Sequence, residues 1–135
     1  MHSHSVEAWE GFSFELICML HLEQIKKKLG INIIATETSS WHAIGNKDKK
    51  GAQIDLVIER SDRIINLCEI KFSAEPYLIT KDYEMKLRER MALFKEATST
   101  RKSVVTTMIT TYGILRGIHS GVVQSEVIMD DLFEK

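Results

Sequence analysis

Three residues in the middle of the chain, Asp55, Glu69 and Lys71, have the types and spacing of a site that binds a divalent metal ion and activates water. Hard cations such as Mg²⁺ or Mn²⁺ take oxygen ligands, usually one or two carboxylates together with water and substrate phosphate. The metal lowers the pKa of a bound water, and a neighbouring lysine can orient that water or stabilise developing negative charge. The alternative is a solvated strand face, because an aspartate followed by E-x-K occurs by chance in many charged sequences.

Asp55 and Glu69 belong to two segments, residues 53–60 and 64–72, that a three-residue turn separates. Both segments alternate in hydrophobicity and are rich in Ile, Leu and Val, so we expect a β-hairpin. Its register places Asp55 opposite Glu69, with Cβ atoms roughly 4.5–5.5 Å apart, and Lys71 on the same face. The opposite face is apolar and carries Ile54, Leu56, Ile58, Cys68 and Ile70.

Like charges directly opposite each other on a sheet are unfavourable, and a bound cation would offset that repulsion. Gln53 lies opposite Lys71 in the same register, so it is a candidate supporting group next to the metal site.

A further carboxylate, Glu15, lies on the apolar stripe of a helix predicted over residues 9–29. The other members of the stripe are Cys18, Leu22, Ile25 and Leu29. An isolated buried charge is costly, so Glu15 needs a partner, and a metal ion is one such partner. The alternative is that Glu15 lies at the end of the stripe and reaches solvent or pairs with a lysine.

The remaining elements follow from the same periodicities. We expect a strand over 32–38, a polar turn over 45–51, a helix over 80–97 with Thr80 as N-cap, and strands over 103–110 and 121–129. The order is helix, three strands, helix and two strands, which predicts a mixed α/β fold with helices over a central sheet. Residues 1–8 are expected to form a flexible tail, and residues 9–135 a single domain.

The composition fits one compact domain of 135 residues, 44% of them hydrophobic. With 18 basic and 19 acidic residues the formal charge is −1, so any basic surface for nucleic acid must be local. Cys18 and Cys68 lie in apolar runs and are expected to be small buried residues, which favours a reducing, cytoplasmic setting. No apolar stretch has membrane-spanning length, so we expect no membrane association.

Residues 80–102 carry seven basic and four acidic side chains. We take Lys81, Lys86 and Arg90 as candidate contacts to a nucleic-acid backbone, which needs such a local excess. The alternative is an ordinary solvated helix face.

The segment around the hairpin, GAQIDLVIERSDRIINLCEIKFS, resembles the core of the PD-(D/E)XK nuclease superfamily. It is most similar there to the C-terminal nuclease-like domain of bacterial and archaeal AAA-type ATPases. The likeness extends to WEGFSFELICMLH, YEMKLRERMALF, TTYG and DDLF. The E-x-K tripeptide alone is a weak signal, and the combination along the chain is far more specific.

This resemblance implies a restriction-endonuclease-like αβββαβ core and a Mg²⁺ or Mn²⁺ site. The implied metal site comprises Asp55, Glu69, Ile70 and Glu15, with Lys71 acting on the water. It also implies nucleic acid, DNA before RNA, as the partner, and an ATPase module in relatives. The proline that names the superfamily is replaced by Ile54, and the chain has no G-x-x-x-x-G-K-[ST] phosphate loop.

Two functional hypotheses follow. The first is a Mg²⁺-dependent nuclease, and the second is a catalytically silent nucleic-acid- or protein-binding regulatory module that keeps the nuclease fold. A third hypothesis is an oligomerisation domain, with a homodimer as the simplest assembly.

Overall fold

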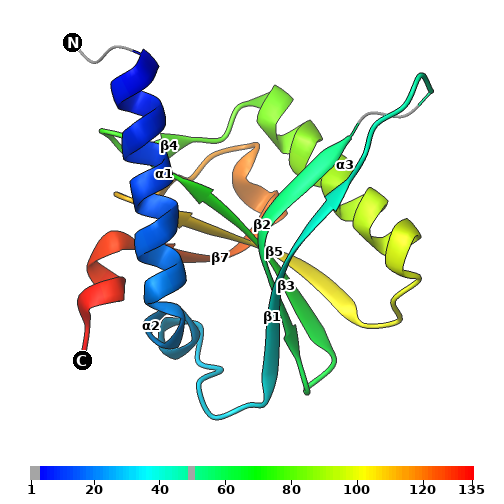
Figure 1. Cartoon of the computed structure of the whole chain (residues 1–135), viewed down its shortest axis with the longest axis horizontal. Helices are drawn as coiled ribbons and strands as arrows, with labels where there is room; N and C mark the ends of the chain where they lie inside the picture. Colours follow the sequence, from blue (N-terminus) through cyan, green and yellow to red (C-terminus); the bar gives the residue numbers. More distant parts are fainter. Residues whose placement is uncertain (1–3, 49–50) are drawn as a thin grey trace.

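The computed structural model of the chain describes residues 4–48 and 51–135, with side chains from Ala8 onward. Its helices are α1 (His4–Leu20), α2 (Leu22–Lys28), α3 (Lys81–Thr98) and the short 3-10 helices η1 (Ser120–Val122) and η2 (Met129–Phe133) (Figure 1). Its strands are β1 (Thr36–Ala43), β2 (Ala52–Arg60), β3 (Ile64–Lys71), β4 (Tyr77–Leu78), β5 (Ser103–Thr110), β6 (Ile114–Leu115) and β7 (Val123–Ile128). None of the described helices has the length and apolar character needed to span a bilayer.

The described long strands form one mixed sheet in the order β1-β2-β3-β5-β7. Strands β1, β2 and β3 are antiparallel neighbours, whereas β3, β5 and β7 run parallel. Parallel neighbours need a crossover connection, and α3 lies in the connection from β3 to β5. The short strands β4 and β6 pair in a separate parallel sheet. The mixed α/β class predicted from the sequence is therefore confirmed.

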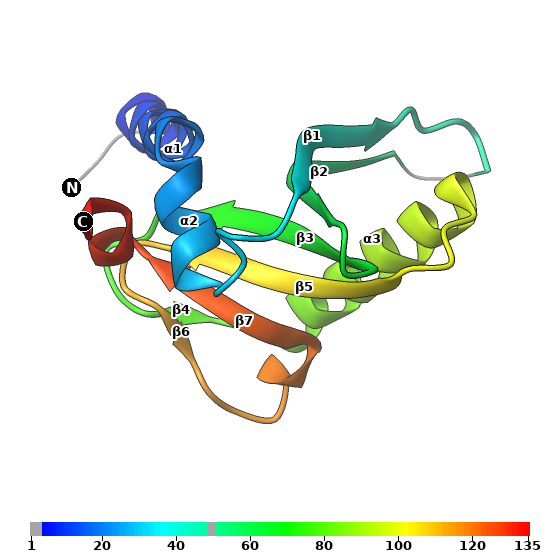
Figure 2. The ribbon, with the colours of Figure 1, turned by 90° about the horizontal axis from the view of Figure 1, so that it is seen from below.

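Helices cover both faces of the sheet (Figure 2). On one face, Phe14, Ile25 and Leu132 from α1, α2 and η2 pack against β2 and β3. On the other face, Leu87 and Phe94 from α3 pack against the sheet. Strands β2 and β3 lie between these layers, which explains why they carry buried apolar side chains on both faces.

The helix predicted over 9–29 is two helices that meet at His21. Nδ1 of His21 lies 2.7 Å from the carbonyl oxygen of Ile17, and the His21 amide donates to Cys18 at 3.0 Å instead. The imidazole therefore occupies a carbonyl that the helical ladder would use, and the ladder is interrupted. Helix α2 ends close to the predicted bound at residue 29, and Gly30 follows with φ of 75°, a left-handed conformation that glycine adopts without strain.

The strand predicted over 32–38 is displaced, since β1 begins at Thr36 and continues to Ala43. Ile31 is buried in the core, and Ile34 packs against that core from a turn in which its amide donates to the Ile31 carbonyl at 3.1 Å. The apolar run therefore anchors the turn after α2 and does not form a strand.

Other boundaries agree more closely with the sequence. Strand β5 has the predicted bounds, and Thr80 caps α3 by accepting a hydrogen bond of 3.1 Å from the Tyr83 amide. Strand β7 is shorter than the predicted 121–129, because 3-10 helices flank it on both sides. Of the predicted tail over 1–8, residues 1–3 lie outside the described part of the chain, and α1 begins at His4.

Candidate functional site

The predicted hairpin register is confirmed where β2 and β3 form a regular ladder. Leu56 lies opposite Cys68, and the same spacing continued by one residue would pair Asp55 with Glu69, just beyond the end of the ladder. The regular pairing ends at Leu56, so Asp55 lies at the point where β2 separates from β3.

A β-bulge adds to this separation. In the β1–β2 pair, Ser39 lies opposite Val57, but Trp41 lies opposite Ile54, so β2 has one residue more than β1 in between. Asp55 is one of the two residues within the bulge. Bulges bend a strand and re-aim its side chains, and they are common next to functional sites.

The bulge overturns one prediction about the hairpin. The alternating pattern predicts Ile54 on the same face as Leu56 and Ile58. Ile54 packs instead with Phe94 in the cluster under α3, while Leu56 and Ile58 face α1. The extra residue reverses the alternation between positions 54 and 56.

The Asp55 side chain reaches toward β3. Its Oδ2 atom accepts a hydrogen bond of 3.4 Å from the Ile70 amide. In an extended strand the N–H and C=O of one residue point to the same edge, so the Ile70 carbonyl also faces the Asp55 side. The Ile70 side chain is buried in the core under α1. Ile70 could therefore serve a metal only through its carbonyl oxygen.

Helix α1 brings Glu15 to the same place. Burial raises the pKa of Glu15, and the negative charge of Asp55 and a hydrogen bond with it raise the pKa further, while the Lys71 ammonium lowers it. Two carboxyl groups in contact require a shared proton or a cation. The sequence left open whether Glu15 reaches solvent, a lysine or a metal, and in the structure its carboxyl contacts Asp55.

Glu69 is the most buried acid of the site, with only 4% of its surface exposed. Nη1 of Arg90, from α3, donates to its Oε2 at 2.9 Å. Burial raises the pKa of Glu69 to about 7, because the desolvation cost exceeds the opposing effect of Arg90, and the charge of Asp55 adds to the rise. The influence of Asp55 shows that the two acids of the hairpin are electrostatic neighbours.

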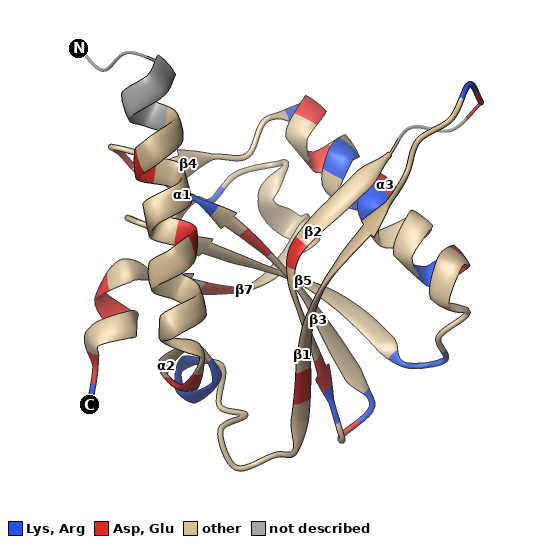
Figure 3. Cartoon of the chain, viewed as in Figure 1, with Lys and Arg blue, Asp and Glu red and all other residues tan. Residues whose placement is uncertain are grey.

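Lys71 is the basic group next to these acids. Its charge lowers the pKa of both Glu15 and Glu69, so its ammonium acts on acids from two different elements. Figure 3 shows acidic positions on α1, β2 and β3 in one part of the molecule, with a basic position at the end of β3. The structure therefore brings together the four residues that were predicted to be catalytic: Glu15, Asp55, Glu69 and Lys71.

Tyr83 of α3 connects the two basic groups of the site. Its ring centroid lies 5.4 Å from Nζ of Lys71, within cation–π range. Its hydroxyl hydrogen-bonds with Arg90 and lies 4.0 Å from the sulfur of Met108. Tyr77 packs edge-on against the same ring, with 5.5 Å between the ring centroids. The aromatic pair fixes the surroundings of Lys71 and of the Glu69–Arg90 pair.

The role of Arg90 at Glu69 was not predicted, although the sequence contains a signal for it. Arg90 lies on the inward stripe of α3 with Tyr83, Leu87 and Phe94, all of which are buried. A charge on an apolar stripe needs a partner, which is the argument that singled out Glu15.

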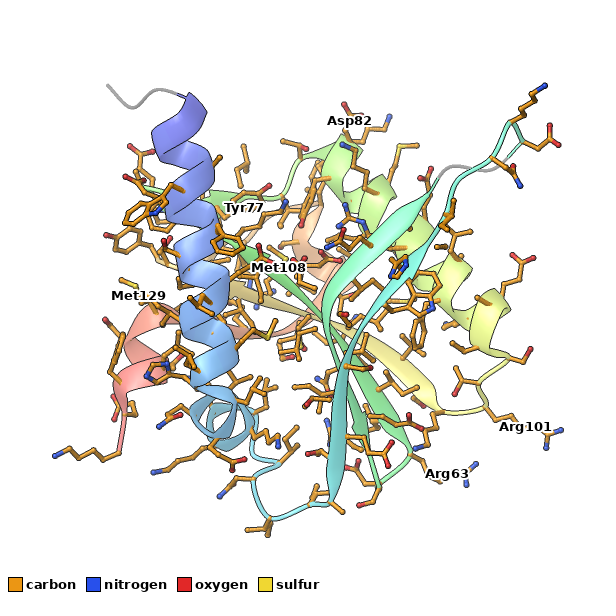
Figure 4. All side chains as sticks on the ribbon, viewed as in Figure 1. Arg63, Tyr77, Asp82, Arg101, Met108 and Met129 are labelled. Carbon is orange, nitrogen blue, oxygen red and sulfur yellow. The ribbon has the colours of Figure 1, made fainter. Side chains whose placement is uncertain are left out.

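The predicted nucleic-acid contacts, Lys81, Lys86 and Arg90, have different surroundings, since Arg90 pairs with Glu69. Lys81 and Lys86 are exposed on the first half of α3. Lys102 pairs with Glu59 at 2.8 Å, and Arg101 lies at the other end of the molecule from the start of α3 (Figure 4). The basic residues of this stretch therefore do not form one continuous surface within the described chain.

Gln53, the predicted supporting group, is exposed and lies opposite His42 in the β1–β2 pair. No described contact joins Gln53 to Lys71, because β2 has already separated from β3 at that position.

The oxygen donors suit a hard cation. Among the described residues, no three His, Cys, Asp or Glu side chains converge as a ready metal cage. Mg²⁺ does not need such a cage, since it binds through one or two carboxylates and keeps several waters. The contact between Glu15 and Asp55, with Glu69 nearby, fits that requirement.

Both cysteines are free and buried, as predicted. Burial, followed by the nearby charge of Glu15, raises the pKa of the Cys18 thiol to about 12. Burial likewise raises the pKa of the Cys68 thiol, so neither is a thiolate at neutral pH.

Comparisons with known proteins bear on the fold alone. No protein-family profile matches the chain, and no curated protein matches its sequence. Among solved structures, the chain is similar to the crystal structure of a protein of unknown function, AF1548. The TM-score is 0.51 at 18% identity, over 78% of this chain and 54% of that chain. The chain thus spans about half the length of that protein and shares part of its fold.

Proposed function

We propose that this domain hydrolyses phosphodiester bonds in nucleic acid, with DNA as the first expected substrate and Mg²⁺ or Mn²⁺ as cofactor. The observation that supports this most is the position of Asp55, which hydrogen-bonds with Glu15 of α1, raises the pKa of Glu69 on β3 and lies in the same region as Lys71. The order of elements agrees with the αβββαβ core of the PD-(D/E)XK superfamily, which the sequence resembles.

Asp55 is the central ligand in this proposal, because it contacts both Glu15 and the backbone of Ile70 and raises the pKa of Glu69. When bound there, the ion would acidify a water molecule and neutralise charge at the phosphorus. Arg90 donates to Oε2 of Glu69, so in this proposal the other carboxylate oxygen of Glu69, Oε1, would bind the ion.

In this proposal Lys71 stabilises negative charge and Glu15 exchanges a proton with water. The Lys71 ammonium, held over the Tyr83 ring, can orient the attacking water and donate to an oxygen that gains negative charge. Burial and Asp55 raise the pKa of Glu15, so its carboxyl keeps its proton to a higher pH than an ordinary glutamic acid and can exchange it with water in the site.

The test is a nuclease assay with Mg²⁺ or Mn²⁺ on single- and double-stranded DNA and RNA. We expect metal-dependent cleavage, which Asp55→Asn abolishes and Lys71→Ala lowers by about 10²–10³-fold. Glu59→Gln is the matched control, because Glu59 is an exposed acid on the same strand that pairs with Lys102 outside the site. Full cleavage by Asp55→Asn would contradict the proposal.

A second candidate is a catalytically silent binding module. Two observations favour it: Arg90 already engages Glu69, and the net charge is −1. Binding of nucleic acid without cleavage of any substrate, at saturating metal, would support this alternative.

A further inference from the structure

Helix α1 has a second apolar face besides the one that packs on the sheet. Trp9, Phe12, Leu16 and Leu20 expose 67%, 68%, 52% and 72% of their surfaces. Their spacing of three, four and four residues places them in one line along the helix, which we name the outer stripe. Phe14 and Cys18, on the inward side of the same helix, are buried.

The outer stripe points away from the body of the molecule. In Figures 1 and 2, α1 lies at the periphery, with the sheet on its inner side. Four large side chains in one line form a contiguous patch, in contrast to single exposed residues such as Ile33 or Ile118. Contiguous patches of this kind mark interaction sites on soluble proteins.

The charges of α1 limit what the stripe can bind. The helix contains no Lys or Arg between residues 4 and 20, and its charged residues are Glu7, Glu10 and Glu15. Helices that lie on anionic lipid surfaces carry Lys and Arg on their polar side, and phosphate backbones require the same charges. An apolar protein surface is therefore the fitting partner.

We infer that the occupant is a second copy of this chain, with the two α1 helices packed antiparallel about a twofold axis. The stripe is graded, with aromatic residues in its first half and leucines in its second half. An antiparallel pair places Phe12 against Leu16 of the partner subunit and Trp9 against Leu20 of the partner subunit. One surface is thus complementary to itself, as an isologous interface requires.

The area is sufficient for a small specific interface. Eight such side chains, four from each copy, would bury on the order of 1,000 Å² in total, which is the lower bound for a specific contact. The dimer should accordingly be of moderate strength and depend on protein concentration.

The test is sedimentation equilibrium of the 135-residue chain without added metal, from about 1 to about 200 µM, since small interfaces are weak. We expect the mass to rise from that of a monomer to that of a dimer. Phe12→Lys and Leu16→Glu should each remain monomeric, and their equimolar mixture should dimerise, because position 12 of one copy faces position 16 of the other. Ile118→Lys, at a residue 92% exposed outside the stripe, is the matched control and should dimerise like the parent.

Circular dichroism of each variant is the control for folding. If one of this pair does not fold, Trp9→Lys and Leu20→Glu form a second complementary pair with the same expected behaviour. A parent chain that stays monomeric at 200 µM, or charged variants that dimerise like the parent, would overturn the inference. A mixture that stays monomeric would overturn the antiparallel arrangement.

Discussion

At the residue scale, Asp55 links two acidic groups: it hydrogen-bonds with Glu15 and raises the pKa of Glu69, while Lys71 and Arg90 supply the neighbouring positive charge. The acids are not equivalent. Glu69 is almost fully buried and paired with Arg90, whereas Glu15 and Asp55 are half-buried and contact each other. Burial therefore governs the protonation of Glu69, and its consequence can be measured as a pH dependence of stability.

The first prediction concerns the Glu69→Gln variant. The pKa of Glu69 is raised to about 7 in the folded state, above its ordinary value of 4.5. The stabilising contribution of protonated Glu69 is therefore complete below about pH 4.5. Between about pH 4.5 and 7 the unfolded chain has released this proton and the folded chain still holds it, so the free energy of unfolding falls as the pH rises. We expect the parent to lose on the order of 3 kcal/mol relative to Glu69→Gln over this range, by urea denaturation. A difference that does not change with pH would contradict the raised pKa.

The second prediction concerns Arg90→Ala. Above pH 7 the variant leaves a buried, charged Glu69 without its partner, so we expect a loss of about 3 kcal/mol at pH 8. The loss at pH 5 should be clearly smaller, because Glu69 is then protonated. In a Glu69→Gln background, Arg90→Ala should cost the same at both pH values. Equal losses in both backgrounds at pH 8 would show that Arg90 acts through packing alone.

The sequence predicted the acids and Lys71 as site residues but not the role of Arg90, for a physical reason. Glu69 and Lys71 follow from strand alternation and Glu15 from a helical stripe, whereas the bulge interrupts the alternation at Asp55. Arg90 interrupts a stripe in the same way, but its basic neighbours on α3 suggested a nucleic-acid surface. Which acid it meets depends on how α3 lies over β3, and local spacing does not encode that.

At the element scale, local signals decided where helices begin and end. Thr80 caps α3 as predicted, and α2 ends close to the predicted residue 29, because both signals act within a few residues. The division between α1 and α2 at His21 and the bulge in β2 were not predicted. The bulge is defined only by the pairing of β1 with β2, and the position of β1 was itself displaced in the prediction.

The third prediction belongs to this scale. Thr80→Ala removes the acceptor for the Tyr83 amide, so we expect α3 to be less stable and the domain to lose about 1 kcal/mol in urea denaturation. Thr80 is exposed, so little packing is lost with it. Thr80→Ser keeps the hydroxyl and should retain most of the stability. An equal loss in both variants would mean that the Thr80 methyl group, and not the cap, matters.

At the scale of the whole molecule, the candidate site lies where three elements meet. Helix α1 supplies Glu15, the bulge of β2 supplies Asp55, and the end of β3 supplies Glu69 and Lys71, while α3 closes the opposite face with Arg90. Hydrophobic packing on both faces of the sheet holds these elements in place. The packing thus brings like charges together, and such sites commonly reduce the stability of a fold in exchange for function.

The last prediction tests this cost directly through Asp55→Asn. In the presence of a chelator, the variant should be more stable than the parent by on the order of 1 kcal/mol, because Glu15 and Glu69 then face a neutral amide. Its amide oxygen can still accept from the Ile70 amide.

Added Mn²⁺ should raise the Tm of the parent progressively, since a ligand that binds only the folded state stabilises it. The same titration should leave the Tm of Asp55→Asn nearly unchanged, and Glu59→Gln should respond like the parent. An equal response of parent and Asp55→Asn would place the bound metal elsewhere on the chain, and a variant less stable than the parent in chelator would mean that Asp55 serves the fold itself.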